Sequence, residues 1–134
     1  MSEPVWLPRD LVCAIHDEQL AIHGGPSGIR DEGMLLSALD RPRNKWGYGE
    51  TDLAVLAAAA GFGLARNHPI IDGNKRAAFL SIITFLGLND WEFVADETGS
   101  VVMIEQMASG IVREAELAVW IRVNVKPAED GASS

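Results

Sequence analysis

The stretch HPIIDGNKRAAF gathers five polar side chains of chemically useful types within nine positions: His68, Asp72, Asn74, Lys75 and Arg76. Its pattern predicts a turn followed by the start of a long apolar helix. A helix begins at its positive end, where cations are disfavoured by about 0.3–1 kcal/mol. Two cations in the first turn therefore make a poor helix start unless an anion binds there.

The same residue types suit a phosphate group. The free backbone N–H groups of a helix that starts at Asn74 form an anion site, and Gly73 leaves room for close approach. Lys75 and Arg76 can each add charge-assisted hydrogen bonds to phosphate oxygens. Asp72 would repel a phosphate unless a divalent cation lay between them, and Mg²⁺ is commonly held by one or two carboxylates plus phosphates.

His68 lies four residues before Asp72, near enough to act as the base for a hydroxyl that attacks the phosphate. The stretch therefore predicts a nucleotide polyphosphate site with its own general base. Each residue also has a structural interpretation, since His68 could cap the preceding helix and the two cations could lie in solvent or pair with Asp72 for less than about 1 kcal/mol. The combination favours function, because local rules are broken mainly at functional sites. The chain contains no GxxxxGK[ST] or GxGxxG phosphate loop.

Length, composition and charge restrict the classes of protein to which the chain can belong. With 134 residues, 48% of them hydrophobic, we expect one domain over residues 1–125 and a disordered tail over residues 126–134. The net charge of −8, from 11 basic and 19 acidic residues, argues against loose binding to nucleic acid or to anionic membrane. The single cysteine, Cys13, has apolar neighbours and indicates a core position and a reducing compartment. No secretory leader and no apolar run of about 18 residues is present, so we expect a cytoplasmic protein.

Hydrophobic periodicity predicts an all-α fold. About six helices are expected, over residues 8–23, 31–40, 51–67, 74–87, 96–109 and 113–123. The third and fourth are apolar nearly all round, so they should form a buried central pair, with Thr51 as the N-cap of the third. Residues 41–49 are rich in proline and glycine and predict a loop or a small hairpin.

In the first predicted helix, Leu11, Ala14 and Ile15 share one side and indicate the buried face. His16 and His23 are seven residues apart on one face and could suggest a metal pair. No third ligand completes the pattern, so we expect these histidines to lie on an exposed face.

The motif HPxxDGNKR, together with GIRDEG at residues 28–33 and FGLARN at residues 62–67, resembles the pattern of the Fic/Doc superfamily. The similarity is to its Doc (death-on-curing) form, the toxin component of type II toxin–antitoxin modules, and it covers about residues 4–124. The resemblance implies an all-α Fic/Doc fold with a small flap over the active site, which we expect at residues 41–49.

Two positions bear on the chemistry that the resemblance implies. The larger Fic branch, which transfers AMP to a protein hydroxyl, has glycine in place of Lys75 and a second arginine in place of Phe79. Doc-type proteins have lysine and lack that arginine, and they are known as kinases of a protein hydroxyl, with elongation factor Tu the characteristic target. We therefore expect phosphoryl transfer from ATP with Mg²⁺ to a translation factor, and AMP transfer or a non-catalytic binding module are the alternatives. Ile70, where the family usually has phenylalanine, is a core substitution of similar character.

The resemblance also assigns roles to the motif residues: His68 as catalytic base, Asp72 as Mg²⁺ ligand, Lys75 and Arg76 as phosphate clamps, and Gly73 and Asn74 as the anion hole. Arg30 and Asp31 belong to the family pattern and fit either a structural role ahead of the short second helix or a substrate contact. The self-inhibitory motif [S/T]xxxE[G/N] of some Fic proteins is absent from the chain. We therefore expect control by an antitoxin in trans, a segment of which folds into a groove on this domain.

Overall fold

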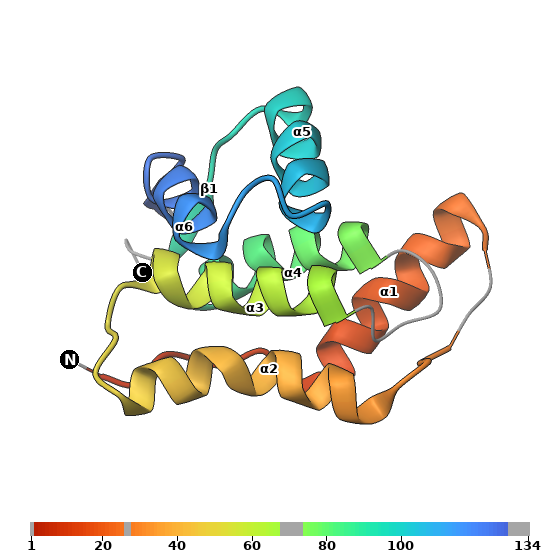
Figure 1. The fold of residues 1–134 in the computed structure, drawn as a ribbon, viewed down its shortest axis with the longest axis horizontal. Helices are drawn as coiled ribbons and strands as arrows, with labels where there is room; N and C mark the ends of the chain where they lie inside the picture. The colour runs from red at the N-terminus through yellow and green to blue at the C-terminus, as the bar shows by residue number, and fades with distance from the viewer. Residues whose placement is uncertain (1, 26–27, 68–73, 129–134) are drawn as a thin grey trace.

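The computed structural model describes residues 2–25, 28–67 and 74–128. Figure 1 shows that helices dominate these residues, which confirms the predicted all-α class. The elements are α1 (Arg9–His23), α2 (Glu32–Gly47), α3 (Leu53–Asn67), α4 (Asn74–Leu88), β1 (Trp91–Phe93), α5 (Glu97–Ala108), α6 (Glu114–Arg122) and β2 (Val125–Pro127).

The pair α3 and α4 lies at the centre, as the sequence predicted. In Figure 1, α2 lies on one side of this pair and α5 and α6 lie on the other. Almost every residue of α3 between Ala54 and Ala65 is buried. Trp120 of α6 packs against the core and Ile121 is fully buried, which confirms that the last helix closes it.

Small residues in α3 let its neighbours approach closely. A Cβ added at Gly61 would meet the Ile82 side chain of α4 at 2.5 and 2.6 Å. A Cβ at Gly63 would meet the Cα of Ala38 in α2 at 3.1 Å. A Cβ at Gly61 would require the Ile82 side chain to shift, and a Cβ at Gly63 would require the Ala38 backbone to move by a few tenths of an ångström. Glycine therefore allows α2 and α4 to lie this close to α3.

The second helix is longer than predicted. Instead of ending near Asp40, α2 runs through Pro42 to Gly47, so the expected loop or hairpin at residues 41–49 is wrong. Its buried residues are Leu35, Ala38, Leu39 and Pro42, which continue one helical stripe across the proline. Burial of this stripe against α3 offsets the hydrogen bond that proline cannot donate.

Two short strands form the antiparallel sheet of the described residues. Trp91 pairs with Pro127, and Phe93 pairs with Val125. Ordered structure therefore continues past the predicted end at Val125, because Lys126 and Pro127 belong to a strand. The rest of the predicted tail, residues 129–134, lies outside the described residues.

Aspartates cap three of the helices. The Asp31 carboxylate accepts a hydrogen bond from the Met34 N–H at 3.0 Å, and Asp96 accepts one from the Gly99 N–H. Asp52, rather than the predicted Thr51, precedes α3 and accepts from the Ala54 N–H at 2.9 Å. Such caps satisfy amide groups that a helix start leaves unpaired. Asp31 thus has the structural role that the sequence left open.

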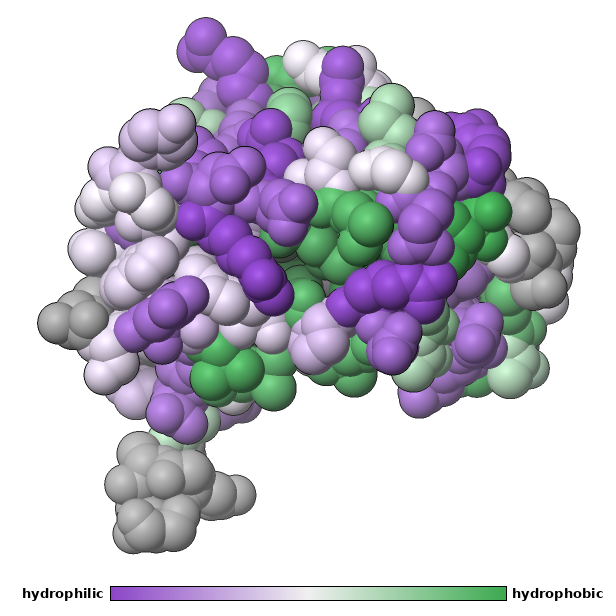
Figure 2. Space-filling model, turned by 90° about the horizontal axis from the view of Figure 1, so that it is seen from below, coloured by the Kyte–Doolittle hydropathy of each residue, from purple (hydrophilic) through white to green (hydrophobic). Residues whose placement is uncertain are grey.

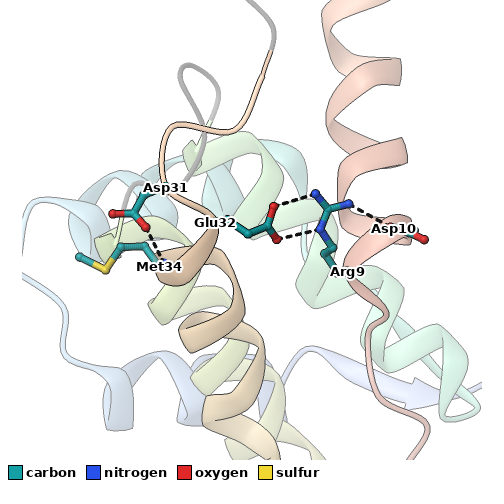
Figure 3. A network of polar contacts seen from close by, with 5 residues as sticks. All are labelled: Arg9, Asp10, Asp31, Glu32 and Met34. Atoms are coloured by element: carbon teal, nitrogen blue, oxygen red, sulfur yellow. Dashed lines mark hydrogen bonds and ion pairs between the residues drawn. The ribbon is translucent and has the colours of Figure 1, made fainter.

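A salt bridge joins the start of α1 to the start of α2 (Figure 3). Arg9 donates from its Nε and one terminal nitrogen to both carboxylate oxygens of Glu32, at 2.8 and 2.7 Å. These hydrogen bonds lower the pKa of Glu32.

Burial raises the pKa of the nearby Cys13 thiol, and Cys13 packs partly buried against the core, as predicted.

The buried face of α1 differs from the predicted one. Val12 and His16 are the buried residues of this helix, whereas Ala14 and His23 are exposed. The expectation that His16 lies on an exposed face is therefore wrong. Its side chain is only 4% exposed, and its Nε2 has no hydrogen-bond partner within the described part of the chain.

The face that carries α2 is mostly polar (Figure 2). Apolar side chains gather there in separate small areas rather than in one continuous patch. Across the described ranges, none of the helices combines the length and apolar character that crossing a bilayer requires.

Candidate functional site

The predicted site lies where the chain passes from α3 to α4. His68, Asp72 and Gly73 fall within residues 68–73, which lie outside the described residues. The structure describes what flanks them, Asn67 as the last residue of α3 and Asn74 as the first of α4. The predicted base and metal ligand are thus joined to the ends of the two central helices.

The C-terminal end of α3 is fixed by contacts on both sides. The Asn67 side-chain amide donates to the Met34 carbonyl of α2 at 3.1 Å. Arg66 donates to the Ala108 carbonyl of α5 at 3.3 Å and lies over the Phe62 ring at 5.9 Å. Hydrogen bonds to neighbouring backbone therefore tie the residues just before His68 to two other helices.

The N-terminal end of α4 carries the charge that the sequence predicted. Lys75 and Arg76 occupy its first turn, both are exposed, and no acidic residue shares that turn. The helix has 15 residues, long enough for its backbone dipoles to leave a substantial partial positive charge at this end. Two cations and the first-turn N–H groups together make an electropositive terminus.

Lys75 has a carboxylate partner from another element. Its Nζ lies 2.9 Å from an Oε1 of Glu105, which belongs to α5, and the two side chains are 50% and 58% exposed. The ammonium group therefore attracts an oxygen anion even without a ligand. Figure 1 shows the C-terminal part of α5 near the end of α4 that begins at Asn74.

The described residues fit a phosphate group. A helix N-terminus, a lysine and an arginine are among the groups that bind phosphate oxygens in proteins. The Glu105 carboxylate that pairs with Lys75 is negatively charged and accepts hydrogen bonds through oxygen atoms, as a phosphate group does. A polyphosphate could take that carboxylate's place on Lys75 and also meet Arg76.

The predicted Mg²⁺ site depends on a residue that lies outside the described residues. In the parts of the chain that the structure describes, no group of three or more His, Cys, Asp or Glu residues could hold a metal ion. The predicted Mg²⁺ ligand, Asp72, lies outside these parts. Its role therefore stays a prediction.

The expected flap is not found at residues 41–49, because α2 occupies most of that stretch. The β1–β2 pair does not replace it. Strand β1 begins three residues after α4 ends at Leu88, so it lies near the opposite end of this helix from Lys75. Since a 15-residue helix is roughly 22 Å long at 1.5 Å per residue, the two strands are far from the predicted site.

Sequence reasoning missed Glu105 and the contacts of Arg66 and Asn67. The last two could have been suspected because they directly precede His68. Glu105 gives no such signal, since it lies 30 residues from Lys75 in the chain and its helix resembles any other amphipathic segment.

A family model described as the Fic/DOC family matches residues 6–86, more than half of the chain. The chain belongs to the Fic/DOC family. The matched part runs from just before α1 almost to the end of α4, and it contains the whole stretch from His68 to Arg76.

Two curated proteins are similar to this chain. "Toxin Doc" of Mycolicibacterium smegmatis is 42% identical over 76 residues, covering 54% of this chain and 58% of that protein. "Protein kinase doc" of Escherichia phage P1 is 35% identical over 83 residues, covering 61% of this chain and 65% of that protein. The chain thus matches less than two thirds of the length of either relative.

Proposed function

We propose that this protein is a Doc-type toxin that acts as a protein kinase. It transfers the γ-phosphate of ATP to a hydroxyl group of a translation factor, an elongation factor Tu-like target, and so inhibits translation. The names of the two relatives, one a toxin and one a protein kinase, support this proposal. The observation that carries it is the pair of exposed cations, Lys75 and Arg76, in the first turn of α4.

Each motif residue has one task in this proposal. His68 accepts the proton of the target hydroxyl as the hydroxyl attacks. Lys75 and Arg76 bind phosphate oxygens, while Gly73 and Asn74 supply the backbone and amide contacts of the anion hole. Asp72 holds Mg²⁺, which supplies charge neutralisation to the phosphates when it is bound.

The experiment that tests the reaction uses two labels. The full chain is incubated with a cell lysate and with purified elongation factor Tu, using either [γ-³²P]ATP or [α-³²P]ATP. Phosphoryl transfer labels the target protein from the γ position only. Label from the α position would instead establish AMP transfer, and no label from either would leave a non-catalytic binding module.

The variant His68→Ala links the activity to the predicted base. We expect it to lose labelling by at least about 100-fold, since general base catalysis contributes roughly 10²–10⁴-fold. His23→Ala, which removes an exposed histidine at the end of α1, is the matched control and should label normally. Normal labelling by His68→Ala would contradict the assigned role.

Control in trans completes the proposal. A cognate antitoxin binds this domain through a segment that folds on binding. The test is co-expression of the chain with its neighbouring reading frame, followed by purification. A stable chain that permits growth without any partner would count against this part.

A further inference from the structure

The ion pair between Lys75 and Glu105 joins the predicted phosphate site to a helix outside the family match. Lys75 lies in the matched region, residues 6–86, whereas Glu105 of α5 lies beyond it. The atoms Nζ and Oε1 are 2.9 Å apart, within ordinary hydrogen-bond distance. The contact is therefore formed by this chain's own α5 and is not part of the motif.

Packing of α5 determines where the Glu105 carboxylate can reach. Ile104 and Met107, on either side of it in the chain, are buried. The Arg66 hydrogen bond to the Ala108 carbonyl holds the same end of α5 against α3. Glu105 therefore extends from a packed helix, and its carboxylate does not have to be ordered from a mobile loop to reach Lys75.

Glu105 and a bound phosphate would compete for the same ammonium group. A cation at a helix N-terminus is unfavourable by itself, and a carboxylate beside it relieves that cost. A phosphate that binds Lys75 must either displace this carboxylate or share the three N–H donors of the ammonium group with it.

We propose that Glu105 is a positioning residue that holds Lys75 in the ligand-free protein and lowers the affinity of the site for nucleotide polyphosphate. This inference rests on the proposed function, because it takes α4 to begin at a phosphate site. Both side chains are about half exposed, so water and salt weaken the interaction. We expect its removal to tighten nucleotide binding by about two- to fivefold.

The test measures the dissociation constant of the non-hydrolysable ATP analogue AMP-PNP with Mg²⁺ by calorimetry, using the full chain. Glu105→Gln should bind AMP-PNP two- to fivefold more tightly than the wild type at low salt. The gain should shrink toward none in 0.5 M NaCl, where the Debye length falls to about 4 Å. Glu97→Gln, an exposed acid on the same helix, makes the same change of net charge and should leave the constant unchanged.

A double-mutant comparison separates the effect of the Lys75–Glu105 ion pair from the general effect of removing one negative charge. In a Lys75→Met background, Glu105→Gln should no longer tighten binding, since the shared ammonium group is gone. If Glu105→Gln and Glu97→Gln bind AMP-PNP equally in the presence of Lys75, the inference fails and nucleotide binding stands. If the wild type binds no AMP-PNP, the proposed function and the inference fail together.

Discussion

The two ends of α4 differ in what surrounds them. From Ala77 onward the helix contributes buried residues, including Ile82, Phe85 and Leu86, which pack against α3 and the N-terminal segment. Its first turn instead exposes two cations, one of which pairs with Glu105. The same helix thus stabilises the fold along most of its length and presents charge at its start, so changes at the two ends should have separable effects.

The largest expected stability effect is at the buried end. Phe85 is fully buried and its ring stacks on that of Trp6, with the ring centroids 6.1 Å apart. Phe85→Ala should lower the free energy of unfolding by about 3–5 kcal/mol, because it removes buried apolar surface and leaves a cavity. Urea unfolding measures this change in the free energy of unfolding. At a temperature where the variant is still folded, it should bind AMP-PNP normally.

The control for this change is Val101→Ala, which shortens an exposed apolar side chain of α5. It should change the free energy of unfolding by less than about 0.5 kcal/mol. A Phe85→Ala variant that keeps its stability, or that folds but loses AMP-PNP binding, would remove the distinction between the two ends of α4.

An intermediate effect is expected where α2 approaches α3. Gly63→Ala places a Cβ 3.1 Å from the Ala38 backbone, so it should destabilise the protein by about 1–3 kcal/mol. Gly87→Ala is the matched control in α4, since a Cβ there meets nothing within 4 Å. It should stabilise the protein by about 0.5–1 kcal/mol, as alanine is the better helix former. Equal effects of the two changes would show that glycine does not set the spacing of α2 and α3.

The smallest effect concerns the salt bridge between Arg9 and Glu32. Because Arg9 lowers the pKa of Glu32 in the folded state, this pair stabilises the fold above the unfolded pKa of about 4.3. The contribution is lost as the pH falls through the lower folded pKa. Glu32→Gln should therefore melt below the wild type at pH 7, and the difference in Tm should narrow as the pH falls from 5 to 3.

Thermal unfolding followed by circular dichroism measures this difference. Glu18→Gln, at an exposed acid of α1, controls for the change of net charge. A Tm difference for Glu32→Gln that stays constant over this range would show that the salt bridge with Arg9 adds no stability.

Most of the fold could be predicted from periodicity, because the core helices carry long apolar patterns. The errors at Pro42 and at the two strands share one physical origin, which is that tertiary packing overrides local signals. Pro42 predicts a helix end, yet its burial against α3 keeps α2 helical through it. The strands β1 and β2 have three residues each and pair across a long stretch of chain, so neither has a local signature.

The candidate site was predictable only as far as its local motif. Lys75 and Arg76 lie in the first turn of α4 as expected. The Glu105 contact depends on how α5 packs against α3 and α4, which no short stretch of sequence encodes. His16 shows the same limit, since burial of its face follows from the position of α1 and not from its residue types.

The most direct test of the account is the AMP-PNP affinity of Lys75→Met, measured beside its free energy of unfolding. A charge-assisted hydrogen bond contributes about 1.5–3 kcal/mol, so we expect the dissociation constant to rise by about tenfold or more. Stability should change by less than about 0.5 kcal/mol, as for other exposed substitutions. Lys126→Met, in strand β2, should leave the dissociation constant unchanged. An unchanged affinity for Lys75→Met would contradict the claim that α4 begins at a phosphate site.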